Sequence, residues 1–265
     1  MRSYTNLLRP DTPFGSVADP WRRPTKWLAA LSLLWGEAAS DEPPAIMGAG
    51  LAVMAVHRTR PRTVSVPLAQ FGYHVLVPDR IGENDGIVKV LDDALVQARR
   101  EAQVIAWHNA TDDLHVLQQL PHPEGAPRHA GINAVAEAWR DRTAQERSTA
   151  RCVDTSHDLG PATGHVSETA AVHDLEPMKE FAGAAQQEGA QLACEALAEN
   201  RLMDYSPDVL AASVLTSAVS TALLGGKFTE RLVWREPLSI AEFVGPVAWE
   251  VAPPLFSGVA PSLSE

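Results

Sequence analysis

The chain has 265 residues, of which 45% are hydrophobic and 21% are charged, the mixture of a globular protein rather than a disordered one. Its formal net charge of −11 argues against a basic domain that binds nucleic acid or a membrane surface. Two cysteines, Cys152 and Cys194, are too few for a disulfide framework or a cysteine-rich zinc site. They fit a reduced, cytoplasmic location.

The first residues before the strand-like segments contain four prolines within residues 1–24, which predicts a loosely ordered lead-in. Residues 22–40 then carry cations, an apolar run and small residues in the order of an export signal. The late start of this run favours an interior strand at residues 27–35 instead. The longest apolar stretch, residues 209–224, is shorter than the ~20 residues of a membrane span and contains Ser and Thr, so we expect a buried helix and no membrane partner.

Strand-like patterns fill the first third of the chain, and helical periodicity then takes over. The expected strands are residues 27–35, 45–56, 63–68 with a continuation at 73–77, 103–107 and 151–155. The expected helices are residues 85–101, 112–120, 132–147, 167–183, 185–200 and 207–224. This order predicts one α/β domain over residues 25–234, with helices packed on a mixed sheet. Five prolines in residues 235–265 predict a C-terminal tail that wraps the surface.

The most informative segment is VIAWHNATDDLHVL, at residues 104–117. A buried strand runs into His108 and Asn109, and a helix then begins with Asp112 and Asp113. Free N–H groups and the helix dipole stabilise carboxylates at a helix start, so helix capping is one interpretation. The other is that one Asp, displayed at the carboxyl end of the strand, binds a divalent cation.

The strand-His-Asn-x-x-x-Asp-Leu pattern resembles the second motif of the DEDD-type 3′–5′ exonuclease superfamily, with Asp113 as the motif's Asp. The phrase CVDTSHDL, at residues 152–159, is similar to the family's strand that ends in Asp-Thr. SPDVLAASVLTSA, at residues 206–218, resembles the third motif, which puts a metal-binding Asp in the first turn of the last core helix, here Asp208. LSLLWGEAAS, at residues 31–40, occupies the place of the first strand, which ends in Asp-x-Glu.

The resemblance spans residues 28–224 and implies an RNase H-like fold. In that fold a mixed five-stranded sheet has three antiparallel and then two parallel strands, with helices on both faces. The implied activity is 3′–5′ cleavage of single-stranded DNA or RNA ends with Mg²⁺ or Mn²⁺, because an ion pair activates water and stabilises the leaving oxygen. The implied ion ligands are Glu37, Asp113 and Asp208, and the implied substrate contacts are His108 and Asn109.

Two positions depart from the family's pattern. The first Asp of the family falls at Trp35, which cannot bind a metal ion, so that Glu37 is what remains of that pair. In the third motif a Tyr or His stands four residues before the Asp, but Asp204 occupies this position here. Tyr205, the candidate general base, is one residue out of phase. The acidic pair at residues 41–42 is a candidate replacement for the lost carboxylate.

Three functions are compatible with the sequence. The first is a divergent, weakened 3′–5′ exonuclease, and the second is a catalytically inactive relative that serves as a binding or assembly module. The third is a small-molecule enzyme on another α/β fold, which we expect if the three carboxylates lie far apart. The sequence contains no glycine-rich phosphate loop followed by a helix and no G-x-S-x-G nucleophile elbow.

Overall fold

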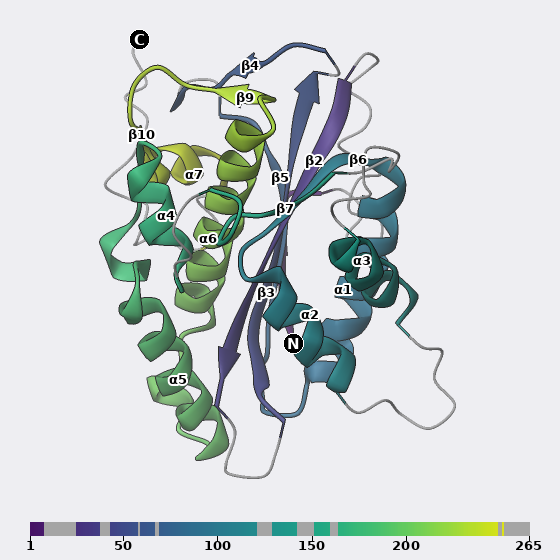
Figure 1. Ribbon diagram of the computed structural model, residues 1–265. Coiled ribbons are helices and arrows are strands. Elements are labelled where there is room, and N and C mark those ends of the chain that lie inside the picture. The colour runs from purple at the N-terminus through teal and green to yellow at the C-terminus, as the bar shows by residue number, and fades with distance from the viewer. Residues whose placement is uncertain are drawn as a thin grey trace.

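A six-stranded mixed sheet lies between two layers of helices (Figure 1). Its strand order is β1 (Arg2–Thr5), β5 (Gly72–Val77), β3 (Ala45–His57), β2 (Thr25–Gly36), β6 (Ala102–Trp107) and β7 (Arg151–Asp154). This computed structural model describes residues 1–7, 25–37, 43–57, 59–66, 69–120, 129–141, 151–159, 164–248 and 251.

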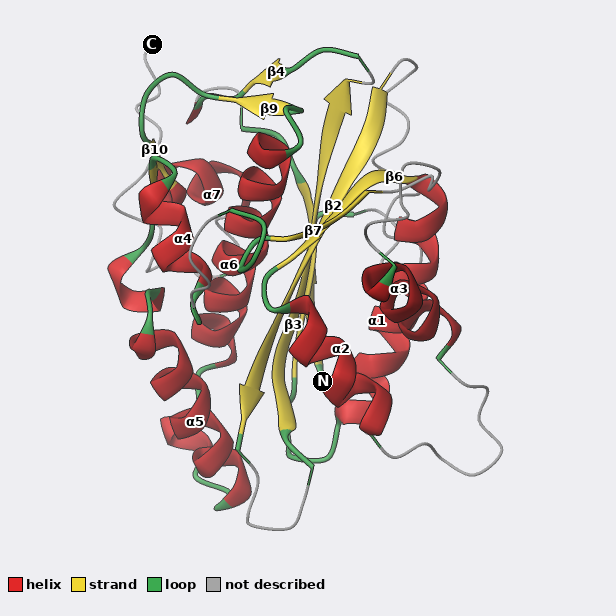
Figure 2. Cartoon of the chain, in the orientation of Figure 1, coloured by secondary structure: helices red, strands yellow, loops and turns green. Residues whose placement is uncertain are grey.

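The helices cover both faces of the sheet, as the sequence predicts. One face carries α1 (Asn84–Glu101), α2 (Ala110–Gln119) and α3 (Ala130–Arg140). The other carries α4 (Val166–Val172), α5 (Ala184–Ala198), α6 (Pro207–Phe228) and α7 (Ile240–Ala248) (Figure 2). The expected α/β architecture with a mixed sheet is therefore confirmed.

Strand β2 is central because it pairs antiparallel with β3 on one side and parallel with β6 on the other. Its side chains alternate between two cores: Leu28 and Ala30 pack on the α6 side, and Ala29 and Leu31 pack on the α1 side. A strand covered on both faces needs a continuous apolar run, and this one has it. The interior strand expected at residues 27–35 is confirmed.

The directions of the strands divide the sheet into two parts. β2, β3 and β5 are antiparallel neighbours, whereas β6 and β7 run parallel to β2. β1 adds a sixth strand, antiparallel to β5, where the sequence predicts part of a loosely ordered lead-in. The prediction missed β1 because a four-residue edge strand is held by backbone pairing with β5, which proline content does not reveal. Residues 8–24 of the predicted lead-in lie outside the described residues.

Helix α6 is the main support of the sheet and packs across β2, β3, β5 and β6. It has the length and hydropathy of a membrane span, but 94% of its most apolar window is buried within the protein. Gly48 and Gly50 of β3 permit the close approach, because an added Cβ would lie 2.4 and 2.7 Å from side-chain carbons of Val214. The buried helix expected at residues 207–224 is thus confirmed.

Two expected elements in the middle of the chain have different boundaries. Instead of a strand at residues 63–68, the two-residue strand β4 (Arg62–Thr63) pairs with β9 (Leu232–Val233), outside the main sheet. The helix expected at residues 167–183 ends at Val172, and β8 (Leu175–Glu176) and a 3-10 turn, η3 (Lys179–Phe181), follow. Asp174 has a positive φ of 61° and Pro177 follows it, and both features interrupt a helix.

The C-terminal region is part of the domain up to at least residue 248, rather than a tail that begins at residue 235. β10 (Leu238–Ser239) pairs with β8, and α7 follows directly. Phe243 and Val244 of α7 are buried in the core that α6 occupies, because the apolar face of this short helix outweighs the cost of Pro246 within it.

Candidate functional site

A polar cleft of about 140 Å³ lies at the carboxyl end of β6. It is formed by the end of β2, the β6–α2 turn, the start of α4, and side chains from α5 and α6. Three of the residues that the sequence singles out line it, His108, Asn109 and Asp113. Trp35 and Ser217 line it as well. We call this hollow the β6 cleft.

The β6–α2 turn is held by a buried carboxylate at the end of β7. Asn109 has left-handed backbone geometry, with a φ of 59°. Asp154, which is fully buried, accepts hydrogen bonds from the backbone N–H groups of Asn109 (3.2 Å) and Ala110 (3.1 Å). The hydroxyl of Ser156 also donates to it, at 2.6 Å. Asp154 therefore satisfies two backbone N–H groups at the start of α2 and places a negative charge at its positive end.

Asp112 and Asp113 lie in the first turn of α2, as the capping interpretation expects, but Asp154 accepts the hydrogen bonds described at the start of this helix and Asp113 accepts from indoles instead. The sequence predicts the strand that ends at Asp154, but it predicts no role for this Asp. Its position directly after the buried pair Cys152 and Val153 is the signal for a buried carboxylate at the carboxyl end of a strand.

Asp113 lies between two tryptophans. The indole N–H of Trp35 donates to its Oδ1 at 2.7 Å, and the indole N–H of Trp107 donates to its Oδ2 at 2.7 Å. Trp107 is fully buried and Asp113 is 9% exposed. Burial raises the pKa of Asp113 to about 7 against the opposing effect of the two indole donors, and the charges of Asp112 and Asp154 raise it further.

Trp35 reaches Asp113 because of its place at the end of β2. The pairing of β2 with β3 shifts register between Leu34 and Trp35, so the strand is irregular where it leaves the sheet. The backbone oxygen of Trp35 accepts a hydrogen bond from the side-chain amide of Gln187, at 3.2 Å. Its indole thus stands where the resemblance places a metal-binding Asp, and it contacts the carboxylate that would share the ion.

Glu37, the third predicted ligand, is exposed beside α5. Its backbone N–H donates to the side-chain oxygen of Gln191 at 2.8 Å, and its backbone oxygen accepts from the thiol of Cys194 at 3.7 Å. Its side chain does not line the β6 cleft. The acidic pair at residues 41–42, the candidate replacement for the lost Asp, lies outside the described residues.

Asp208 and Tyr205 lie toward the β1 edge of the sheet, away from β6. Asp208 accepts a hydrogen bond of 2.5 Å from the hydroxyl of Tyr4 in β1, and the Tyr205 hydroxyl donates to the backbone oxygen of Pro78. β5 and β3 stand between β1 and β2, so the two strands are three spacings of about 4.8 Å apart. Asp208 is therefore tied to a strand remote from Trp35 and Asp113.

The described residues do not fit a two-metal site of the expected kind. Within the ranges that the structure describes, no group of three or more His, Cys, Asp or Glu side chains is placed to hold a metal ion. Both oxygens of Asp113 already accept an indole N–H, so a metal ion would have to compete with these donors for the carboxylate. Hard ions such as Mg²⁺ need several free oxygen ligands in strict geometry.

Polar side chains of α5 and α6, for which the sequence predicted no role, are hydrogen-bonded to one another at the cleft and beside it. The side-chain amide of Gln186 donates to the hydroxyl oxygens of Ser213 (3.0 Å) and Ser217 (2.7 Å). Ser213 and Ser217 are four residues apart on one face of a helix whose other residues are mostly apolar. That spacing of hydroxyls in an apolar helix was the available signal, because buried polar groups need partners.

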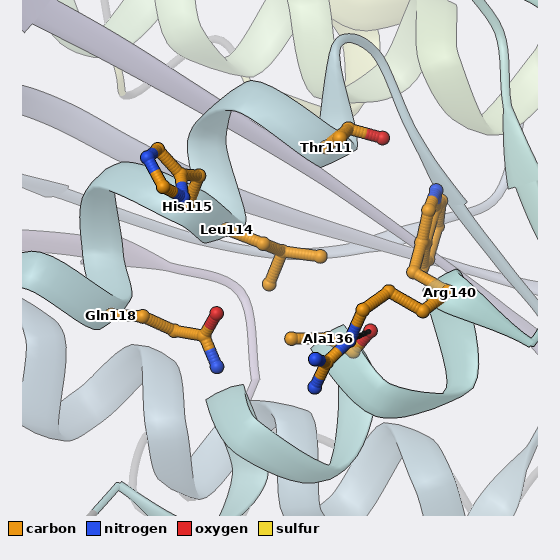
Figure 3. A pocket seen from close by; sticks show the side chains of 7 residues that line it. Thr111, Leu114, His115, Gln118, Ala136 and Arg140 are labelled. Carbon is orange, nitrogen blue, oxygen red and sulfur yellow. Dashed lines mark hydrogen bonds between the residues drawn. The ribbon is translucent and has the colours of Figure 1, made fainter.

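A second pocket, of about 280 Å³, lies between α2 and α3 (Figure 3). Leu114 and Ala136 form its apolar base, and side chains of His115, Gln118 and Arg140 surround it. None of the residues that the sequence analysis selected for catalysis or substrate contact lines it.

Comparison with known proteins finds no family model that matches the chain and no curated protein that matches it significantly. The function therefore has to be inferred from the arrangement of the residues themselves.

Proposed function

We propose that this protein is a non-hydrolytic binding module with an RNase H-like fold, and that its β6 cleft takes the end of a single-stranded nucleic acid. The observation that carries the proposal is the pair of indole hydrogen bonds to Asp113, one from Trp35 and one from Trp107. They turn the carboxylate of the nuclease-like motif into a structural acceptor.

The order of the strands supports the proposed fold. Read from β5 to β7, three antiparallel strands are followed by two that run parallel to β2, and α1 connects the two parts. This is the arrangement that the resemblance to the DEDD-type exonucleases implies. In it, β2 takes the place of the strand that would carry the first metal-binding Asp, which is Trp35 here.

The proposed loss of hydrolysis follows from the residues that stand at the expected metal-ligand positions. Two-ion cleavage of a phosphodiester needs carboxylate oxygens that bridge the ions. In this protein, one carboxylate is replaced by an indole, a second is hydrogen-bonded to two indoles, and a third is held by Tyr4. Asp208 and Asp113 are engaged in separate parts of the sheet, and we therefore propose that hydrolysis is absent. This separation is also what the sequence analysis expects of a small-molecule enzyme on another α/β fold. The strand order favours the inactive relative over that alternative.

The chemistry of the cleft suits the nucleoside part of a strand end rather than its phosphates. Among the described residues that line it, the polar groups are hydroxyls, side-chain amides, imidazoles and one buried carboxyl, with no Lys or Arg. Amides such as those of Asn109 and Gln187 form hydrogen bonds with base edges and sugar hydroxyls. We accordingly propose weak binding that depends little on salt, since few phosphate counterions are released.

The test is a combined binding and cleavage assay on a short 5′-labelled single strand with a free 3′-hydroxyl, in the presence of Mg²⁺ or Mn²⁺. We expect the strand to be bound and to stay intact. Gln187→Ala, inside the cleft, should weaken binding, whereas Gln118→Ala, in the pocket between α2 and α3, should not. Metal-dependent shortening of the strand by the wild-type protein would instead support the weakened exonuclease.

Trp35→Asp separates the alternatives further. If the protein is a non-hydrolytic binding module, the Trp35→Asp variant should still not cleave strand ends, because Asp208 is held at β1. New metal-dependent cleavage by a folded Trp35→Asp protein would show that Trp35 alone blocks the chemistry. Failure of any single strand to bind would remove nucleic acid as the ligand and favour an assembly module or a small-molecule site.

A further inference from the structure

An apolar groove lies on the face of the protein formed by α5 and the first turns of α6. It has a volume of about 220 Å³. Ala185, Gly189 and Ala193 of α5 lie on one side and Val209 and Leu210 of α6 on the other. The three α5 residues are spaced by four, so they form one face of the helix over about two turns.

Exposed apolar side chains gather around this groove. Four of the seven large hydrophobic side chains that are exposed in the described part of the chain belong to α5, α6 or the turn between them. Leu192 and Val209 line the groove and are 58% and 42% exposed. Leu202 (57%) and Met203 (98%) belong to the 3-10 turn η4 (Leu202–Asp204), whose last residue lines it. Exposed apolar side chains in and near one groove are typical of an interaction surface.

The charges around the groove are predominantly negative. Residues 179–209 contain six carboxylates and two cations, Lys179 and Arg201. Arg201 is already paired with Glu199 (2.6 Å) and Asp204 (2.7 Å). Two carboxylates, Glu180 and Asp204, line the groove itself, and no Lys or Arg does so among the residues described for it.

We propose that this groove binds a basic amphipathic helix of a partner protein, with the apolar face of that helix in the groove and its cations against the acidic rim. A helix suits an apolar groove about two turns long, because residues at i, i+3, i+4 and i+7 fill it from one side. A second copy of this chain would set the same carboxylates against each other. An anionic membrane surface would be repelled as well. The groove adjoins the β6 cleft, because Gln186 lines both, but the inference does not depend on the proposed function.

The probe is a labelled synthetic helix of Leu and Lys with the leucines on one face, titrated with the full chain and followed by fluorescence anisotropy. Two control peptides are a scrambled sequence of the same composition and an amphipathic Leu and Glu helix. We expect the amphipathic Leu and Lys peptide to bind about tenfold or more tightly than either control. We expect its affinity to fall as salt is added.

Gly189 offers a variant that fills the groove without disturbing the fold. A Cβ added there meets no atom within 4 Å, so Gly189→Phe projects into open space. This variant keeps the net charge, and it should weaken binding of the amphipathic Leu and Lys peptide by about tenfold or more. Gly189→Ala, which changes the helix backbone in the same way, should bind nearly as well as wild type. Glu180→Lys should weaken binding, and Glu137→Lys on α3 should not.

Several results would overturn the inference. Equal binding of the scrambled peptide, or equal binding by Gly189→Phe, would reduce the effect to non-specific charge attraction. Absence of binding by the amphipathic Leu and Lys peptide, or tighter binding of the Leu and Glu peptide, would reject a basic helix. Self-association in sedimentation velocity that Gly189→Phe abolishes would identify a second copy as the occupant instead.

Discussion

The indole N–H of Trp35 donates a hydrogen bond of 2.7 Å to Oδ1 of Asp113, across 78 residues of sequence. This contact joins the end of the central strand β2 to the first turn of α2 and closes one side of the β6 cleft. A buried polar group that loses its hydrogen-bond partner destabilises the folded state. The pair therefore contributes to stability at the position where the resemblance to a nuclease predicts catalysis.

Trp35→Phe removes this hydrogen bond and keeps most of the ring. We expect a loss of about 1–3 kcal/mol in the free energy of unfolding, because one oxygen of a buried carboxyl loses its donor. The measurement is equilibrium urea denaturation. Trp234→Phe is the control, since the Trp234 indole N–H has no hydrogen-bond partner among the described residues and Phe keeps an aromatic ring beneath Lys227. Equal losses in the two variants would contradict the role given to the Trp35 contact.

The raised pKa of Asp113 predicts a specific pH dependence. Between its ordinary value of 3.8 and its folded value of about 7, the folded state holds a proton that the unfolded state releases. The contribution of Asp113 to the free energy of unfolding is therefore fully present below about pH 4, falls as the pH rises, and is lost above about pH 7. The shift corresponds to at most about 4 kcal/mol.

Asp113→Asn isolates this effect, because Asn does not titrate. The difference in unfolding free energy between wild type and Asp113→Asn, measured from pH 4 to pH 8, should favour wild type most at the acid end. In the wild-type protein, tryptophan fluorescence should also change near pH 7, since two indoles contact the carboxyl. A difference that is flat across this range would show that Asp113 is ionised throughout.

Asp154→Asn tests the carboxylate that caps α2 from β7. We expect a loss of about 1–2 kcal/mol or more, because Asp154 is buried and satisfies two backbone N–H groups at the helix start. Asp112→Asn, at an exposed position in the first turn of the same helix, should change stability by about 0.5 kcal/mol or less. Hydrogen exchange of the first α2 amides should accelerate in Asp154→Asn and stay unchanged in Asp112→Asn.

Two glycine substitutions should have opposite effects. Gly48→Ala places a Cβ 2.4 Å from Cγ2 of Val214, so either α6 or β3 must move, at a cost of about 1–3 kcal/mol. Gly189→Ala lies on α5 in open space and should stabilise the protein by about 0.5–1 kcal/mol through helix propensity. Thermal unfolding of both variants checks the pair. A stabilised Gly48→Ala would mean that α6 packs less closely on β3 than described.

Local sequence patterns determined much of the architecture. The apolar run of β2 requires cover on both faces, and the periodic apolar residues of α1 require one buried face. The nearly all-apolar α6 requires burial all round, and the glycines of β3 permit its approach. These features depend on residues that are close together in the sequence, so the order of most strands and helices along the chain could be predicted from them. β1 was missed because its pairing with β5 joins residues about 70 positions apart.

The tertiary structure decided what the acidic residues do. A carboxylate at the start of a helix has the same sequence pattern whether it caps the helix, binds a metal ion or accepts hydrogen bonds from indoles. Asp113 became an indole acceptor because the end of β2 brings Trp35 to it, and Asp154 took the capping role from β7. Asp208 was drawn to Tyr4 because α6 begins near β1. Such contacts are set by how helices cross the sheet, which no local pattern encodes.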